Sequence, residues 1–574
     1  MKYSDKSRFR YRSLQNVASP LFNRFHYNSS KSFFQSPKDD LKVQNDLHVV
    51  SSGNNNSSVN ITSAAAHQQI KQQPSPFTSL NTPHPKLNQF LQKSIPTPNI
   101  TTSTSSTTSQ QQQQHTPFNT AANFNRADIS TLPNGIKVIS QQTNQNACAI
   151  GLYVRGGSAF ETEKNRGVFK LLEKMTFKGT KNESTADIVK KYETISLNAQ
   201  SATSNDSIQF SVEVLRKDVE YILKSFADQI TCPNFDGEEF EEVKMDAIRT
   251  FSHFLNYPED LLPLLMQNVA FGNTGFGQSP HAQPQEYEAL TVEHLRETLK
   301  NHYIGKNIVI SATGIDHRQL VNYVERYYGD IPYSAPSPGV AAAASSLVNT
   351  DRVPYYGGSH LISDVEDAEQ AYYYLAFPCR GFKSVGESKD VYAGFVLQTL
   401  LGGGRDFSVG GPGKGMQSRL NLHVVYALQH VRECSAFLNL EAGIGLFGIR
   451  LATSTGFLKN GISLMLNQLL SLRRLITDEE IERAKRQQKS LILMNLELRG
   501  VLCDDMAKQL LTTGVWRTPD EICRGIDSVT KEDILRFLDQ LLLTEPTIVA
   551  IYDGSQDTAL SGTDLKKIIK SGQY

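Results

Sequence analysis

The distribution of apolar residues divides the chain into a polar first part and a second part that can fold. Residues 41 to about 125 include SSGNNNSSVN, TTSTSSTTSQQQQQ and several prolines. Such a composition buries too little apolar surface to offset the entropy of ordering. From residue 132, LPNGIKVIS places an Asn-Gly turn before an apolar strand, and CAIGLYVRGG follows. We therefore predict a disordered Ser/Asn/Gln-rich segment at 37–126 and folded protein from residue 127.

Strand and helix patterns alternate within the folded part. Apolar side chains alternate with polar ones over Ile208, Phe210, Val212 and Val214, which predicts a half-buried strand. Apolar residues at helical spacing follow between 219 and 230, namely Val219, Ile222, Leu223, Phe226 and Ile230. The pattern predicts an α+β fold.

Two pairs of similar segments indicate an internal repeat. FDGEEFEEVK from Phe235 resembles ITDEEIERAK from Ile476, and LTVEHLRETL from Leu290 resembles VTKEDILRFL from Val529. The offsets are 241 and 239 residues. Shared amphipathic-helix composition explains one such match more easily than two in the same order. We predict two tandem homologous domains, 127–345 and 355–574, each with a mainly antiparallel sheet packed with helices, joined near APSPGVAAAASS.

Charge is distributed unevenly between the start of the chain and the remainder. Residues 1–36 hold seven Lys or Arg and one acid, a net +6, with Ser, Phe, Leu and Tyr between them. This composition is typical of a mitochondrial transit peptide, and the alternative is a disordered basic tail. Residues 127–574 carry 45 basic and 54 acidic residues, a net −9. An acidic body favours cationic partners and argues against nucleic acid.

Other compositional features exclude several classes of protein. No window approaches eighteen uninterrupted apolar residues, which argues against a membrane-spanning helix. The six cysteines are scattered, without a C-x-x-C pair. That spacing fits a reducing compartment and does not fit structural zinc.

The segment GVFKLLEKMTFKGT, residues 167–180, resembles the zinc helix of the pitrilysin-type metallopeptidases. In that family H-x-x-E-H places two histidine ligands one helical turn apart. Here the histidine positions hold Lys170 and Lys174, only Glu173 remains, and the resemblance places the third ligand at Thr250. An ammonium has no lone pair for a metal, so we predict no metal site. The alternative to any catalytic role is a solvated helix face on which Glu173 pairs with the lysines.

Residues 402–416, GGGRDFSVGGPGKGM, hold seven glycines in their first fourteen positions. A phosphate-binding loop would need glycine at 408 and Ser or Thr at 415, where the chain has Ser408 and Gly415. A plain flexible loop remains an alternative, although Phe407, Val409 and Met416 are apolar residues that a spacer does not need. Glycines let a backbone approach an extended peptide without specifying its sequence, so the loop can act as a flap over a peptide.

Together, the glycine loop, the degraded zinc helix, the repeat and the basic presequence resemble the non-catalytic members of the pitrilysin-type metallopeptidase family that serve mitochondrial precursor processing. The resemblance covers roughly residues 127–574. It implies a non-enzymatic subunit of a heterodimer in the mitochondrial matrix, which binds presequences of imported precursors while a beta subunit carries zinc and cleaves them. No cofactor is implied in this chain.

By position, the resemblance assigns presequence contacts to Gly402, Gly403, Gly404, Phe407, Ser408, Gly410, Gly411, Pro412, Gly413, Lys414, Gly415 and Met416. It also makes Glu441, in FLNLEAG, a candidate partner for presequence arginines. The alternative for Glu441 is an ordinary surface residue on a strand.

Two other functions stay open from the sequence. A structural core subunit of the respiratory ubiquinol–cytochrome c oxidoreductase belongs to the same family and can also lack the ligands, which would place the chain at the inner membrane. An active homomeric zinc peptidase is disfavoured by the missing ligands.

Overall fold

The computed structural model describes residues 126–571, except 144–145, 196, 273–274, 336–352, 364, 366–368, 383–388, 404–414 and 442. All of them belong to one compact unit. The predicted transit peptide, nearly all of the predicted low-complexity segment and most of the predicted linker lie outside the described residues.

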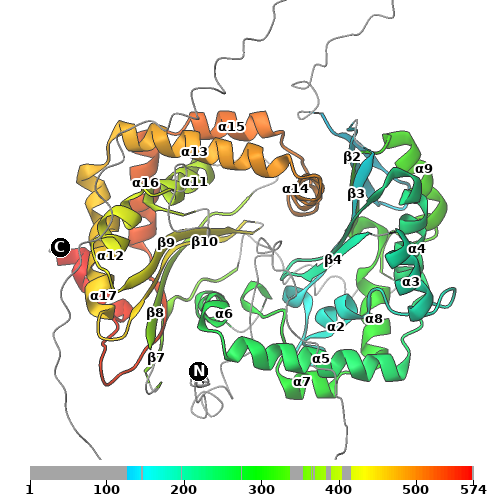
Figure 1. The fold of residues 1–574 in the computed structure, drawn as a ribbon, viewed down its shortest axis with the longest axis horizontal. Helices are drawn as coiled ribbons and strands as arrows, with labels where there is room; N and C mark the ends of the chain where they lie inside the picture. Colours follow the sequence, from blue (N-terminus) through cyan, green and yellow to red (C-terminus); the bar gives the residue numbers. More distant parts are fainter. Residues whose placement is uncertain are drawn as a thin grey trace, which may run out of the picture. The chain divides into compact units, whose positions relative to one another are not determined.

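The first sheet has six strands in the order β1-β2-β6-β3-β5-β4 (Figure 1). Its neighbours are antiparallel except for the parallel pair β2 and β6. The strands are β1 (Asp128–Thr131), β2 (Lys137–Gln141), β3 (Ala147–Arg155), β4 (Asn198–Thr203), β5 (Ser207–Leu215) and β6 (Ile308–Thr313). The turn predicted in LPNGIKVIS joins β1 to β2, and the alternating segment forms β5, which confirms both predictions.

The helices of the first half are α2 (Val168–Met175), α3 (Thr185–Ile195), α4 (Val219–Thr231), α5 (Gly237–Leu255), α6 (Pro258–Phe271), α7 (Pro284–Ala289), α8 (Val292–His302) and α9 (His317–Tyr328). The predicted helix at 219–230 is α4. Apolar residues of α2, α4, α8 and α9 pack with those of the sheet in one core.

The second sheet has five strands in the order β7-β11-β8-β10-β9, again with one parallel pair, β7 and β11. The strands are β7 (Gly358–Ile362), β8 (Gln370–Cys379), β9 (Val431–Leu440), β10 (Gly445–Ser454) and β11 (Thr547–Ile551). The helices are α11 (Lys389–Leu401), α12 (Leu458–Leu475), α13 (Asp478–Leu496), α14 (Arg499–Thr512), α15 (Pro519–Asp527), α16 (Lys531–Leu543) and α17 (Gly562–Ser571).

The two halves have the same strand order, because β2, β6, β3, β5 and β4 take the places of β7, β11, β8, β10 and β9. The two similar sequence pairs also form equivalent helices. Asp236 and Thr477 cap α5 and α13, while Thr291 and Thr530 form capping boxes on α8 and α16. The predicted α+β class with two tandem homologous units is confirmed.

Each half contributes one helix to the other half's sheet (Figure 1). Leu261, Leu262 and Leu265 of α6 belong to one buried cluster with side chains of β8, β10 and β11. In return, Leu502, Met506 and Leu510 of α14 pack against the first sheet, at Ile139, Tyr153 and Val309.

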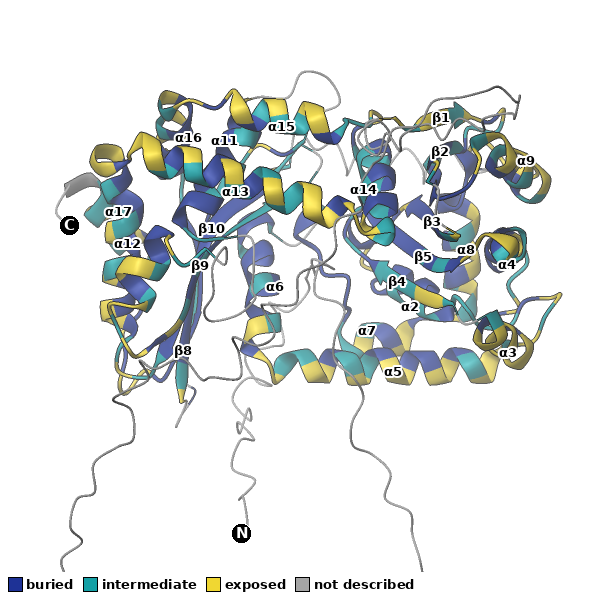
Figure 2. Ribbon diagram, turned by 45° about the horizontal axis from the view of Figure 1, so that its top comes forward, coloured by how far each residue is buried: buried dark blue, intermediate teal, exposed yellow. Residues whose placement is uncertain are grey.

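Hydrogen bonds fix α14 in this place. The Tyr153 hydroxyl donates to Asp504 at 2.8 Å, and the Ser311 hydroxyl donates to the Cys503 carbonyl at 2.8 Å. Figure 2 shows α5 and α13 as helices with buried and exposed stripes, as a helix on a core requires. None of the helices in the described ranges combines the length and the apolar character that a bilayer crossing demands.

Candidate functional site: the zinc-position cluster and the glycine loop

Helix α2 carries the positions that would hold zinc. It begins after Gly167, which adopts φ 82°, a conformation that favours glycine. The buried Glu161 carboxylate accepts hydrogen bonds from the Gly167 and Phe169 amides at 2.9 and 3.1 Å, so it caps the helix. Burial raises the pKa of Glu161 to about 8. The start of α2 is therefore held by a buried acid from the preceding segment.

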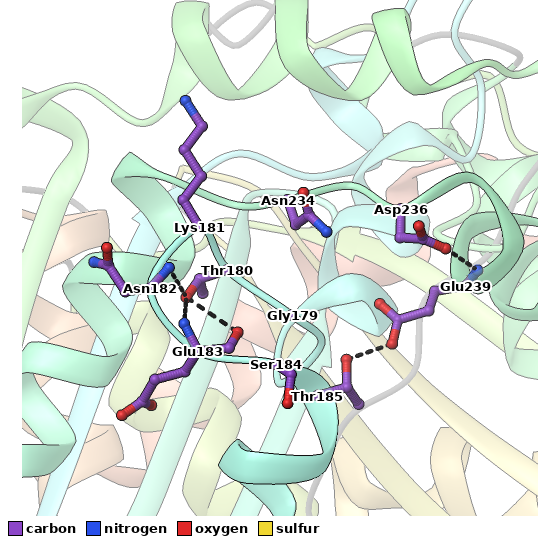
Figure 3. A pocket seen from close by; sticks show the side chains of 10 residues that line it. All are labelled: Gly179, Thr180, Lys181, Asn182, Glu183, Ser184, Thr185, Asn234, Asp236 and Glu239. Carbon is purple, nitrogen blue, oxygen red and sulfur yellow. Dashed lines mark hydrogen bonds between the residues drawn. The ribbon is translucent and has the colours of Figure 1, made fainter.

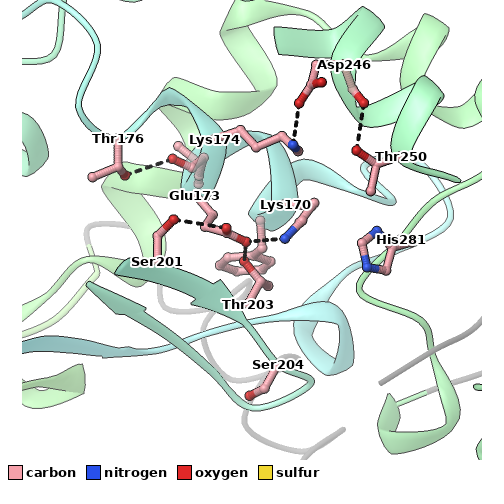
Figure 4. A network of polar contacts seen from close by, with 12 residues as sticks. Lys170, Glu173, Lys174, Thr176, Ser201, Thr203, Ser204, Asp246, Thr250 and His281 are labelled. Atoms are coloured by element: carbon pink, nitrogen blue, oxygen red, sulfur yellow. Dashed lines mark hydrogen bonds and ion pairs between the residues drawn. The ribbon is translucent and has the colours of Figure 1, made fainter. Parts of the chain in front are cut away.

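The Glu173 carboxylate is buried and engaged by three side chains (Figure 4). It lies 2.5 Å from the Lys170 ammonium. It also accepts hydrogen bonds from Ser201 at 3.1 Å and from Thr203 at 2.6 Å, both on β4. The predicted Lys170–Glu173 pair is present, but the predicted solvated face is wrong, because this carboxylate lies between α2 and β4 rather than in water.

The second lysine has a partner on α5. The Lys174 ammonium lies 2.5 Å from Asp246, whose carbonyl oxygen accepts a hydrogen bond from the Thr250 hydroxyl at 2.9 Å (Figure 4). Lys170, Glu173, Lys174, Asp246 and Thr250 are called the zinc-position cluster below.

The residues of the zinc-position cluster do not fit a zinc ion. Two ammonium groups stand where two lone-pair donors are needed, and both are occupied by carboxylates. The Thr250 hydroxyl donates to its own helix. Among the described residues, no group of three or more His, Cys, Asp or Glu side chains is placed to hold a metal.

Sequence reasoning missed one residue beside this cluster. His281 is buried, its ring packs against Phe254 with centroids 4.5 Å apart, and its Nδ1 has no hydrogen-bond partner among the described residues. Burial, together with the charges of Lys170 and Lys174, holds its pKa well below the usual range. The imidazole is therefore neutral at neutral pH. No spacing in the sequence signals it, because His281 lies more than 100 residues beyond the lysines.

The glycine loop is described only at its two ends. Gly402, Gly403, Gly415 and Met416 lie within the described residues, whereas the predicted contacts Gly404, Phe407, Ser408, Gly410, Gly411, Pro412, Gly413 and Lys414 lie outside them. No contact of the described four tests a role in peptide binding, so that role stays a prediction.

The first end of the loop lies along the edge strand β9. The Gly402 carbonyl accepts a hydrogen bond from the Ala436 amide at 3.2 Å, and Gly403 forms a parallel bridge with Ala436. A Cβ atom on Gly403 would lie 2.1 Å from the Ala436 carbonyl oxygen. Gly402 has φ 125°, in the region that favours glycine. These two glycines therefore have a local backbone reason to be glycine.

The second end is also fixed. Gly415 has φ 76°, and its carbonyl accepts hydrogen bonds from the Asn421 side chain at 2.9 Å and the Ser418 amide at 3.0 Å. The Ser418 hydroxyl would lie 2.6 Å from a Cβ atom on Gly402. The two ends of the segment are therefore close together. Arg419 follows, bound to Glu480 through two hydrogen bonds of 2.8 Å.

Glu441 lies in the turn between β9 and β10, not within a strand. Its amide donates to the Ile444 carbonyl at 2.9 Å. Desolvation raises the pKa of its partly exposed side chain well above the usual range, Asp206 adds to this, and Lys508 opposes it. It lies five residues beyond Ala436, roughly 16 Å along the chain at strand spacing. The structure thus does not bring Glu441 beside the ends of the loop.

A surface cavity of about 330 Å³ lies at the starts of α3 and α5 (Figure 3). Its polar groups bond to one another. Thr185 donates to Glu239, Thr180 accepts from the Asn182 and Glu183 amides, and Asp236 caps α5. No lining side chain is left buried without a partner, so these contacts assign it no ligand.

Comparisons with known proteins agree with the geometry. A family model for "Insulinase (Peptidase family M16)" matches residues 137–282, and one for "Peptidase M16 inactive domain" matches residues 289–488. A protease from Helicobacter pylori, known from its crystal structure, has the same fold, with a TM-score of 0.64, 16% identity, and coverage of 74% of this chain and 99% of its own. Two such sheets with a substituted zinc position define a member of peptidase family M16 without the zinc ligands.

Relatives with higher sequence identity define the family within this class more narrowly. Mitochondrial-processing peptidase subunit alpha-1 of Dictyostelium discoideum is 39% identical over 86% of this chain and 82% of the relative. The mitochondrial-processing peptidase subunit alpha of Solanum tuberosum is 32% identical over 74% of this chain and 82% of the relative. The chain belongs to the family of mitochondrial-processing peptidase alpha subunits.

Proposed function

We propose that this chain is the non-catalytic, substrate-recognition subunit of a mitochondrial processing peptidase. It binds presequences of imported precursors, and a beta subunit that carries zinc cleaves them. The observation that carries the proposal is the zinc-position cluster, in which Lys170–Glu173 and Lys174–Asp246 pairs occupy the metal's place. A member of a peptidase family that cannot bind the catalytic metal needs a partner subunit to cleave the peptide bond. Its relatives are named as alpha subunits of mitochondrial-processing peptidase, which supports the role of a partner to a catalytic subunit.

The glycine loop is the element we assign to presequence binding. Its two described ends are held by Ala436, Asn421 and Ser418, so the loop starts and finishes at fixed points of the fold. A glycine-rich backbone can pair with many different extended peptides, while Phe407 and Met416 supply apolar contacts. Presequences are cationic, and the net charge of −9 on residues 127–574 attracts them. Weak binding by an adaptable loop allows the presequence to dissociate after cleavage.

The place of action follows from the same proposal. The basic segment 1–36 directs import, and the mature subunit works in the matrix, where precursors arrive. No contact in the described residues favours the respiratory core-subunit role, and co-purification with cytochromes would reveal that role directly.

Reconstitution tests the proposal. The chain, a zinc-bearing beta subunit and a fluorescent precursor are mixed together and in pairs. We expect cleavage only with both subunits, with zinc in the beta subunit alone. Cleavage by the isolated chain, or unchanged cleavage by the beta subunit without it, would refute the proposal.

A loop variant tests the assigned element. Replacing Gly410 and Gly411 by alanine should weaken presequence binding and slow processing, because each substitution restricts the backbone. Gly237→Ala is the matched control, since a Cβ there meets nothing within 4 Å. Equal binding by the loop variant and the control would count against a role for the loop.

A further inference from the structure

The zinc-position cluster has more hydrogen-bond donors than acceptors among the described residues. Each ammonium carries three N–H donors, and one carboxylate partner is present for each, Glu173 for Lys170 and Asp246 for Lys174. Glu173 is already engaged by Ser201 and Thr203 as well. The lysines therefore keep donors for an additional oxygen atom.

His281 points to the same deficit. Its ring is buried, and Nδ1 lacks a partner among the described residues. A buried polar atom without a partner costs free energy, so native proteins rarely leave one without a role. As a neutral imidazole, His281 can carry its proton on Nδ1 and donate it. The charges of Lys170 and Lys174 both act on His281, and Figure 4 shows its ring on the side of the Lys170 ammonium that faces away from Glu173.

The positive electrostatic field of Lys170 and Lys174 favours an anionic ligand. Desolvation is the largest cause of the lowered pKa of His281, and the charges of Lys170 and Lys174 add to it by disfavouring a positive charge there. The same field favours a negative charge at that point. Asp246 competes for Lys174, but its side chain is 55% exposed. An exposed ion pair is weak, so Asp246 can give way to another carboxylate at little cost.

We propose that Lys170, Lys174 and His281 form a binding site for the carboxylate of a peptide, at the place where catalytic relatives would hold zinc. The ligand carboxylate accepts hydrogen bonds from both ammonium groups and from the Nδ1–H of His281. This proposal uses no residue of the glycine loop and does not depend on presequence recognition by that loop.

Isothermal titration of the full chain with two N-acetylated hexapeptides of the same sequence, without charged side chains, tests the proposal. One peptide has a free C-terminal carboxylate and the other a C-terminal amide. We expect the amide to bind about tenfold more weakly or worse, the effect of losing one charge-assisted hydrogen bond. A third peptide, amidated with an internal glutamate, shows whether a side-chain carboxylate serves as well; inorganic phosphate is the non-peptide probe.

Variants with opposite expected effects separate binding from folding damage. Lys174→Gln should weaken binding of the carboxylate peptide about tenfold, whereas Asp246→Asn should strengthen it by removing the competitor. Lys178→Gln is the matched control, because Lys178 lies three residues beyond the end of α2 and also pairs with an acid of α5, Glu242, at 3.4 Å. The proposal is overturned by equal affinity for the carboxylate and the amide, by phosphate binding without carboxylate binding, or by equal effects of the Lys174 and Lys178 variants.

Discussion

The two lysines of α2 give a quantitative test of how the zinc-position cluster is built. Both form ion pairs of 2.5 Å, but the Lys170 and Glu173 side chains are 14% and 6% exposed, against 21% and 55% for Lys174 and Asp246. Removing one partner of a buried pair costs about 3–5 kcal/mol, whereas an exposed pair contributes about 0–1 kcal/mol. Burial, not distance, should therefore separate the two.

We expect Lys170→Met to destabilise the protein by about 3 kcal/mol, at the low end because Ser201 and Thr203 still bond Glu173. If residues 126–571 unfold as one cooperative unit, an unfolding entropy of about 2.1 cal/mol/K per residue makes this a fall of roughly 3 °C in Tm. Lys174→Met, one turn along the same helix, should cost less than about 1 kcal/mol.

Urea unfolding followed by circular dichroism measures both variants. Adding Glu173→Gln to Lys170→Met should recover more than half of the loss, because the unpaired buried charge is gone while an amide oxygen still accepts from β4. Equal costs for Lys170→Met and Lys174→Met, or no recovery in the double variant, would refute the reasoning.

Three further predictions concern the α14 contact and the glycine loop. Met506→Ala should open a cavity and cost about 2–5 kcal/mol, measured by urea unfolding; a cost under about 1 kcal/mol would contradict the packing of α14. Gly403→Ala should lower Tm, since its Cβ would lie 2.1 Å from a carbonyl oxygen, while Gly237→Ala should not; equal Tm values would remove the structural role of Gly403. Desolvation raises the pKa of Glu480, but its hydrogen bonds to Arg419 outweigh this, so that the pKa is lowered. The pair therefore stabilises the folded protein at pH values above the unfolded carboxyl pKa, and this stabilisation is lost as pH falls through the lowered value. Arg419→Met should flatten that acid limb of a stability-versus-pH curve, and an unchanged limb would exclude the pair as its source.

Local patterns predicted much of the fold because they need no distant information. The alternation in β5 and the helical spacing in α4 each state which face is buried. The similar segments at 235 and 476 form α5 and α13, and each helix starts with a side-chain oxygen cap, from Asp236 in α5 and from Thr477 in α13. Repeated local signals therefore sufficed for the architecture of both halves.

The exchange of α6 and α14 could not be predicted, because an apolar stripe on a helix fits either sheet equally well. The burial of Glu173 was also missed. A Lys and a Glu three residues apart look like a solvated helix face, and the partners that remove water, Ser201 and Thr203, lie on β4. His281 depends on the same long-range folding. The sequence thus indicates which groups are charged, but the tertiary contacts decide which of them are in water.

The helix exchange has a consequence for how the molecule comes apart. Separating the halves would strip α14 from Ile139, Tyr153 and Val309 and strip α6 from the second sheet, exposing apolar surface on both sides at once. Each half has a core of its own between its sheet and its helices, but it needs a helix of the other half to cover further apolar side chains of that sheet. Calorimetry should therefore record a single melting transition for the pair, and gene fragments encoding one half should yield insoluble protein unless the other is co-expressed.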